Sequence, residues 1–205
     1  MKKYYKIIIV FSIIVLILAL LINIPENRKD FKTPHFNFLF SSSIDSSNIV
    51  ELSKVLEASY SKISNNLNTI PADNIEVNIY AQRWRYVKAT GHWNASGNVE
   101  GISKLHFIEN TWLESEISKI AVHELTHAIF LKLLIDREPE PLNVENFNEK
   151  FSKLPIWIWE AVSVYEPEQF YDPKTLNYLN NGKYPDISEL NNRSKGQKIY
   201  PVDTL

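Results

Sequence analysis

The sequence predicts an α+β domain with a small mixed sheet, preceded by one N-terminal transmembrane helix. Three observations support this fold class. Residues 7–22 are apolar except for Ser12. Strand-like and helix-like segments are interleaved along the rest of the chain. One strongly apolar helical segment carries His123 and His127 four positions apart, which places polar groups inside a buried helix.

The composition limits the function classes that the chain can belong to. Its 205 residues suit one membrane segment and one domain of ordinary size, at roughly 100–200 residues per domain. The formal net charge is −2, and no run of Lys and Arg marks a nucleic-acid surface, so nucleic acid is not an expected partner. The absence of Cys excludes disulfides, thiolate zinc sites and a cysteine nucleophile.

Residues 7–22 predict a membrane anchor that contacts the lipid bilayer. A helix that crosses a bilayer needs about 20 apolar residues, and about 17 suffice. A cleaved secretory signal is the competing interpretation, but residues 19–21 lack the pair of small residues at a cleavage site. We therefore predict an uncleaved signal-anchor over residues 1–24.

The charges beside the anchor give a topology. Lys2, Lys3 and Lys6 precede it and Arg28, Lys29 and Lys32 follow it, so the positive charges nearly balance. The short Lys-rich tail favours the cytoplasmic side for the N-terminus. We expect a single-pass protein of the cell membrane with its domain outside the cytoplasm.

The segments before the histidines predict a tether and the first half of the domain. Residues 25–34 contain two prolines and mixed charge and predict a short tether, so the domain is expected over residues 35–205. Asn48 and Glu51 resemble a capping pair that opens a helix reaching Leu67. The other expected elements are strands over 35–40, 75–80 and 102–108, and a loop over 83–101 that holds three of the chain's five glycines.

The second half of the domain is predicted to be helical. Thr111 and Glu114 form a capping box that starts a helix running to Ile135. A short helix is expected over 143–151, and another opens at Pro155 and stops before Pro167. The tail from residue 168 onward is polar and interrupted by prolines.

The turn His123-Glu124-Leu125-Thr126-His127 predicts a zinc site. Residues four apart share one face of a helix, so the two imidazoles can bind one metal ion. Glu124 lies about 100° round the helix, which suits a general base acting on water at the metal. Two unrelated core histidines are the alternative, but their strongly apolar surroundings would leave buried polar groups without partners. One Zn²⁺ ion is the expected cofactor.

A catalytic zinc needs a third protein ligand. Phe130 and Leu133 occupy the positions where a metzincin has Gly and His, so that option fails. Glu160 is the one acid in an apolar helix and needs a partner there, which favours it as the ligand over a structural role. On spacing alone, four other acids are also candidates for the third ligand, although their polar neighbours indicate solvent exposure: Glu138, Glu140, Glu145 and Glu149.

The histidine turn, followed by Pro-x-Trp-x-x-Glu-x-x-x-x-Tyr over residues 155–165, resembles the gluzincins, in particular the peptidase-MA-like zinc metallopeptidases. The resemblance extends from about Phe36 to Val202. It implies a zincin-like domain with an edge strand over a metal-binding helix. It also implies that His123, His127 and Glu160 bind zinc, that Glu124 is the general base, and that strand 102–108 flanks the cleft and pairs with an extended peptide.

Two departures from the family pattern bear on activity. Ala161 follows Glu160 where the family usually has Gly. Family members tend to continue with a further helix after the region that matches residues 200–202, whereas this sequence ends at Leu205. We therefore expect either a naturally short form of the domain or a C-terminally truncated one, and the loss of a helix near the metal site would lower its activity.

A peptidase also needs a donor for the oxyanion that forms during attack on the peptide carbonyl. His92, His106 and Tyr165 are the candidates on position, although each is more commonly structural. The leading hypothesis is a membrane-anchored zinc metallopeptidase that cleaves peptide or protein substrates. The alternative is a non-catalytic, membrane-tethered zinc-binding module derived from such a peptidase.

Overall fold

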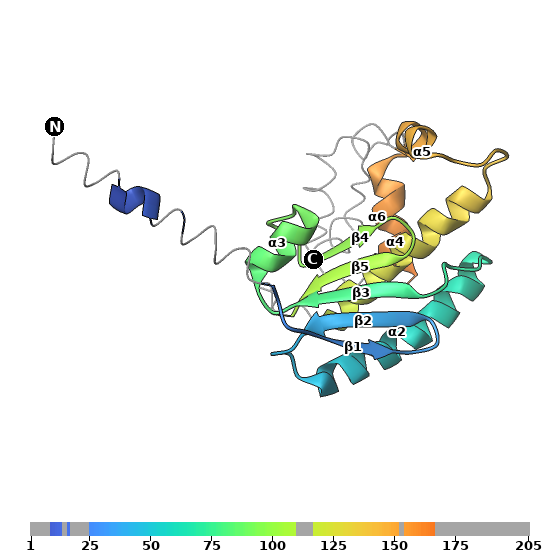
Figure 1. Cartoon of the computed structure of the whole chain (residues 1–205). Coiled ribbons are helices and arrows are strands. Elements are labelled where there is room, and N and C mark those ends of the chain that lie inside the picture. The colour runs from blue at the N-terminus through green and yellow to red at the C-terminus, as the bar shows by residue number, and fades with distance from the viewer. Residues whose placement is uncertain (1–8, 14–15, 17–24, 110–116, 152–153, 167–205) are drawn as a thin grey trace, which may run out of the picture.

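The fold is α+β with a mixed sheet, as the sequence predicts, and the sheet has five strands (Figure 1). The computed structural model describes residues 9–13, 16, 25–109, 117–151 and 154–166. The strands are β1 (Arg28–Lys32), β2 (Phe36–Ser41), β3 (Ile75–Tyr80), β4 (Gly97–Glu100) and β5 (Lys104–Ile108). The helices are α2 (Ser46–Leu67), α3 (Arg83–Thr90), α4 (Ile117–Asp136), α5 (Val144–Phe151) and α6 (Ile156–Tyr165).

The strands lie in the order β1-β2-β3-β5-β4. The three central strands β2, β3 and β5 are parallel, and the edge strands β1 and β4 each pair antiparallel with a neighbour. Helices connect the parallel strands, because a parallel pair cannot be joined by a tight turn. Alternate residues of each strand therefore face either the layer of α2 and α4 or the layer of α3.

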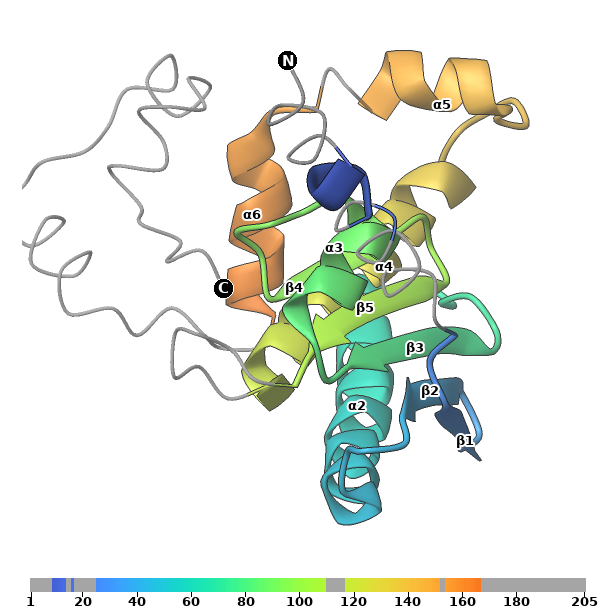
Figure 2. The same cartoon turned by 60° about the vertical axis from the view of Figure 1, so that its left-hand side comes forward.

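The main core lies between the sheet and the helices α2 and α4 (Figure 2). Every second residue of the central strands points into it, and each fully buried aromatic or aliphatic side chain contributes about 1.5–3 kcal/mol. The buried strand residues of this core are Phe36, Phe38, Phe40, Ile75, Val77, Ile79, Leu105 and Phe107. This packing fixes α4, the helix that carries the histidine turn, against the sheet.

The opposite face of the sheet is covered in part by α3. Tyr80, Tyr86 and Ile108 form a small second core there. Beside it, His106 Nδ1 lies 3.1 Å from the Tyr80 hydroxyl and its Nε2 lies 3.2 Å from Glu100 Oε2. This face is therefore a connected polar layer, in contrast to the apolar face under α4.

Three predicted elements differ in the structure. The segment 25–34, predicted to be a tether, contains β1, and the predicted loop 83–101 contains α3 and β4. β1 and β4 are short and largely polar, so they lack the alternation that marks a strand, and only pairing with a neighbour defines them. The long first helix starts at Ser46, because Asp45 accepts the Ser47 N–H at 2.9 Å as its N-cap, and not at the predicted pair of Asn48 and Glu51.

Several predictions fall largely or wholly outside the described residues. Of the predicted membrane segment 7–22, the structure describes only residues 9–13 and 16, and within the described ranges no helix is both long and apolar enough to cross a bilayer. The capping box at Thr111 and Glu114 and the tail from residue 168 also lie outside them.

Arg28 attaches β1 to the sheet. Its guanidinium donates to Asn78 Oδ1 at 2.9 Å and to the Leu39 carbonyl at 2.6 Å, and it lies 5.1 Å from the centre of the Tyr80 ring. Since the Arg28 side chain is only 27% exposed, solvent screens these interactions incompletely. β1 is therefore part of the folded domain.

We expect Arg28→Ala to lower the free energy of unfolding by about 2 kcal/mol, because two charge-assisted hydrogen bonds and a cation–π contact are lost. Arg28→Lys should recover little of this, since an ammonium cannot reproduce the planar fork. Urea unfolding followed by tryptophan fluorescence measures the change. Lys54→Ala, which removes an exposed ion pair with Glu51, is the control and should change stability by less than about 0.5 kcal/mol. An equal effect of the two alanine variants would contradict this account of Arg28.

Candidate metal centre

The polar side chains of α4, His123, Glu124 and His127, are buried inside the domain. The helix contacts the sheet, α2 and α6, and it is apolar along most of its length (Figures 1 and 2). His123 and His127 are each 4% exposed, and Glu124 is 9% exposed. Because the histidines are four residues apart, their rings lie on one face of the helix, with centroids 4.7 Å apart.

Glu160 reaches the two histidines from α6. Its Oε2 lies 3.4 Å from His123 Nε2 and 3.8 Å from His127 Nε2. One ligand atom from each of the three residues lies within 4.8 Å of the others. Two ligands of a tetrahedral zinc at about 2.0–2.1 Å are roughly 3.3–3.5 Å apart. The 3.4 Å separation lies in this range and the 3.8 Å separation is wider, so the group is compatible with a metal ion. The side chains that the sequence selects as ligands therefore come together.

The protonation of the group also suits a metal. Burial, followed by the charge of His123, lowers the pKa of the His127 imidazole well below its ordinary value. His127 is therefore neutral around pH 7, and a neutral imidazole is the form that binds metal. The group consists of two histidines and one glutamate, which is the residue set of many catalytic zinc sites.

Glu124 lies beside this group and against the edge strand β4. A Cβ atom on Gly97 would lie 2.9 Å from Glu124 Cγ and 2.5 Å from Ile120 Cγ2, so only glycine permits this approach of strand and helix. Burial raises the pKa of Glu124 to about 7, against the opposing charge of His123 and with a smaller upward contribution from Glu160. A carboxyl group with such a pKa exchanges a proton near neutral pH.

Two residues that the sequence analysis did not single out hold the histidines. The Trp159 ring stacks on His127 at 4.4 Å with an interplanar angle of 8°. Ser163 Oγ lies 3.2 Å from His123 Nε2 and donates to the Glu160 carbonyl at 2.9 Å. Ser163 is three positions after Glu160, so helical spacing alone indicates that it shares the face of Glu160.

The outer nitrogens of the histidines are oriented by packing. In the part of the chain that the structure describes, neither His123 Nδ1 nor His127 Nδ1 has a hydrogen-bond partner. Metal-ligating histidines usually donate this N–H to a carboxylate or carbonyl. The His127 ring instead contacts two rings, stacking flat on Trp159 and meeting His123 edge-on.

The other acids that spacing left open do not join the ligand group. Glu138 pairs with Lys150, which bridges the end of α4 to α5. Glu140 and Glu149 are exposed, as the polar neighbours of this segment predict. The side chain of Glu145 lies outside the described residues. Among the described acids, Glu160 alone faces both histidines.

The three candidate oxyanion donors His92, His106 and Tyr165 lie outside the His-His-Glu group. His106 alternates with the core residues Leu105 and Phe107 along β5, so it points to the face opposite α4, where it contacts Tyr80 and Glu100. His92 is exposed after α3, and its backbone N–H donates to Thr90 Oγ1. Tyr165 is 69% exposed at the end of α6. None of these three side chains belongs to the His-His-Glu group.

The edge strand of the sheet next to α4 is not the one that the resemblance implies. Strand 102–108 was expected to pair with a peptide, but β5 (Lys104–Ile108) lies between β3 and β4 and both its edges are occupied. The edge strand on the side of α4 is β4. The error arises because β4 is a four-residue strand with no apolar alternation in its sequence, Gly-Asn-Val-Glu.

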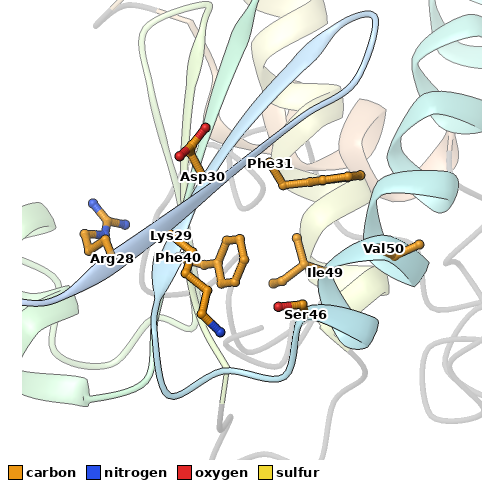
Figure 3. Close-up of a pocket in the computed structure, with 8 residues that line it drawn as sticks. All are labelled: Arg28, Lys29, Asp30, Phe31, Phe40, Ser46, Ile49 and Val50. Atoms are coloured by element: carbon orange, nitrogen blue, oxygen red, sulfur yellow. The ribbon is translucent and has the colours of Figure 1, made fainter.

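A separate hollow lies away from the histidines, between the β1–β2 hairpin and the start of α2 (Figure 3). It has a volume of about 480 Å³, and Phe31, Phe40 and Ile49 line its apolar part. Its charged lining residues are Arg28, Lys29 and Asp30. Its lining contains none of the three residues of the His-His-Glu group.

Searches against models of known protein families and against curated proteins return no match for this chain. The likeness to the gluzincins therefore stays a prediction that rests on the motif residues themselves.

We expect added Zn²⁺ to stabilise the protein by about 2.7 kcal/mol at a free zinc concentration 100 times the Kd, because only the folded chain brings the three ligands together. Glu160→Gln should weaken zinc binding by more than the roughly 10–100-fold that loss of an outer partner costs. Calorimetric titration and the thermal midpoint with and without chelator measure both effects. Glu138→Gln is the matched control and should bind zinc normally. Unchanged zinc affinity in Glu160→Gln would exclude it as a ligand.

We expect Gly97→Ala to lower the free energy of unfolding by about 1–3 kcal/mol, because the new methyl group overlaps Ile120 and Glu124. Urea unfolding measures the loss. Asn98→Ala, one residue along β4 and on the opposite face, should change stability by less than about 0.5 kcal/mol. If Gly97→Ala were as stable as the unaltered chain, the close approach of β4 to α4 would be wrong.

Proposed function

We propose that the chain is a zinc metallopeptidase of the gluzincin type, with a peptidase-MA-like zincin domain that hydrolyses peptide bonds. One observation carries the proposal: Glu160 Oε2 lies 3.4 and 3.8 Å from the two histidine Nε2 atoms, with the buried Glu124 beside them. His123, His127 and Glu160 hold the ion. With zinc held by these residues, the site would have a Lewis acid that could lower the pKa of water there toward about 7.

Glu124 acts as the general base in this proposal. It is one position round the helix from His123, so its carboxylate points beside the ligand group and does not compete for the ion. Its pKa of about 7 lets it accept a proton from water and return it to the leaving amine near neutral pH. Gly97 allows β4 to hold this carboxylate in place from the side opposite the helix.

The substrate peptide is proposed to bind along β4. Within the described residues no further strand pairs with β4 beyond its contact with β5. An extended peptide can add to such an edge through main-chain hydrogen bonds. Because Gly97 is both the first residue of β4 and the residue against Glu124, a peptide on this edge is carried past the proposed general base.

The proposed location is the cell membrane, with residues 7–22 as a single span and the domain outside the cytoplasm. The described residues 9–13 are helical, and Ile9, Val10, Phe11 and Ile13 are between 47% and 66% exposed. Apolar side chains with this exposure favour contact with lipid over contact with water. The Lys residues at 2, 3 and 6 favour the cytoplasmic side for the N-terminus.

A second candidate function is a membrane-tethered zinc-binding module without catalysis. It is favoured by the position of His106, which lies on the wrong face of the sheet to stabilise an oxyanion. Glu124 argues for the enzyme, since a structural zinc site has no need of a buried carboxylate beside its ligands.

We expect the zinc-loaded full chain, in detergent micelles, to cleave members of a mixed peptide library, and Glu124→Gln to lower the rate by about 10²–10⁴-fold. Mass spectrometry of the peptides measures cleavage, and zinc content is measured on the same samples. Glutamine is isosteric with glutamate, so the zinc content should be unchanged. Glu138→Gln serves as the matched control with full activity.

Cleavage that persists in Glu124→Gln would refute its role as base. Stoichiometric zinc with no cleavage by the unaltered chain would favour the non-catalytic module.

A further inference from the structure

The first strand of the sheet begins almost at the end of the predicted membrane span. Only residues 23–27 separate Ile22 from Arg28. At about 3.5 Å per residue, this link reaches at most roughly 20 Å. The sheet therefore starts close to the membrane surface if residues 7–22 span the bilayer.

The start of β1 is fixed to the rest of the domain. Arg28 is bound to Asn78 and to the Leu39 carbonyl, and Glu26 lies 3.7 Å from both Arg28 Nε and Arg85 Nε. The Glu26 side chain is 12% exposed. Because β1 and Glu26 are held by both β3 and α3, the link to the membrane cannot lengthen by peeling this strand away without breaking buried contacts.

The register of the sheet connects this anchored end to the metal centre. One row of paired residues runs straight across all five strands: Lys29, Phe40, Ile79, Phe107 and Gly97. The row has four interstrand steps, which is about 19 Å at about 4.8 Å per step. Its last residue touches Glu124. In Figure 1 the arrowheads of β2 and β3 lie on the side where β1 begins.

The row places the proposed general base at the anchored end of the sheet. The opposite end is marked by Ile70, which follows α2 and is 79% exposed. α2 has 22 residues and so is about 33 Å long, and it runs away from the anchored end. The centre is therefore on the near side of the domain and not on its far side.

A large aromatic side chain is exposed at the same end. Trp93 is 56% exposed and lies four residues before Gly97, in the loop that leads into β4. Tryptophan is enriched at membrane interfaces, because its ring is apolar and its N–H donates to polar headgroups.

We infer that the metal centre faces the membrane and that the substrates are peptide segments lying next to the bilayer, such as the juxtamembrane parts of other membrane proteins. The inference rests on the proposed peptidase function and on the predicted anchor. The centre is tied to the bilayer by a short link and a fixed strand. A peptide bond close to the membrane is therefore presented to β4 and Glu124 at high effective concentration, whereas one far from it is not.

The orientation can be tested without any activity. The chain contains no Cys, so Asn94→Cys and Ile70→Cys each give a single labelling site in the full chain. With a donor dye at either site and acceptor dyes on lipid headgroups in vesicles, we expect about twofold higher transfer efficiency from position 94. The reason is the length of α2, about 33 Å, between the two ends. Equal transfer, higher transfer from position 70, or no transfer from either would overturn the orientation.

The substrate class is tested with a peptide that the full chain cleaves in the library experiment, linked to a lipid through either a short or a long spacer. With the enzyme in the same vesicles, we expect faster cleavage for the short spacer. A Gly/Ser insertion before Pro25 that adds about 40 Å should remove this preference, while the same insertion between Glu138 and Pro139 should not.

Cleavage that is independent of spacer length would overturn the substrate class alone. If no peptide is cleaved, the proposed function fails and the substrate class fails with it. The transfer measurement then shows separately whether the orientation holds.

Discussion

α4 is enclosed on three sides, by the sheet, α2 and α6, and it carries two imidazoles and a carboxyl group into that enclosure. Burying an ionisable group without a partner lowers the stability of the fold by several kcal/mol. The side chains of this turn are therefore stable only if other elements of the fold provide groups that pair with them. α6 provides Glu160, whose carboxylate lies next to both histidines. α6 also packs on α4 through the flat contact between Trp159 and His127. The helix that defines the site and the helix that completes it are therefore fixed by one interaction network.

The sheet has a group of polar side chains on each face: the His-His-Glu group with Glu124 on the α4 side, and a hydrogen-bonded group on the α3 side. On the α4 side, Gly97 is the one position of β4 at which a side chain is excluded, because the helix and Glu124 occupy the space. On the other side, Glu100, His106 and Tyr80 form a chain of hydrogen bonds under α3. A shift of β5 by one residue would turn His106 toward α4, so the register of this short strand decides on which face of the sheet His106 lies.

The same register relates the site to the way the chain is held. β1 lies at one edge of the sheet and β4 at the other, and both contribute to the row that crosses the strands at one end. Arg28 and Glu26 make the first of these edges rigid. An enzyme with this arrangement would select substrates by position as well as by sequence, since effective concentration falls steeply once the link cannot span the distance.

The sequence by itself determined the local features: the two histidines on one helix face, Glu124 beside them, Glu160 as the acid that apolar neighbours isolate, and the strands whose side chains alternate. These follow from helical and strand periodicity over a few residues, which local chain geometry sets. Only the tertiary structure decided that β4 is the edge strand, that β1 belongs to the sheet and that His106 faces away from α4. Strand partners are chosen by hydrogen bonds and packing between residues far apart in the chain, and a short polar strand has no signal of its own until its neighbour is in place.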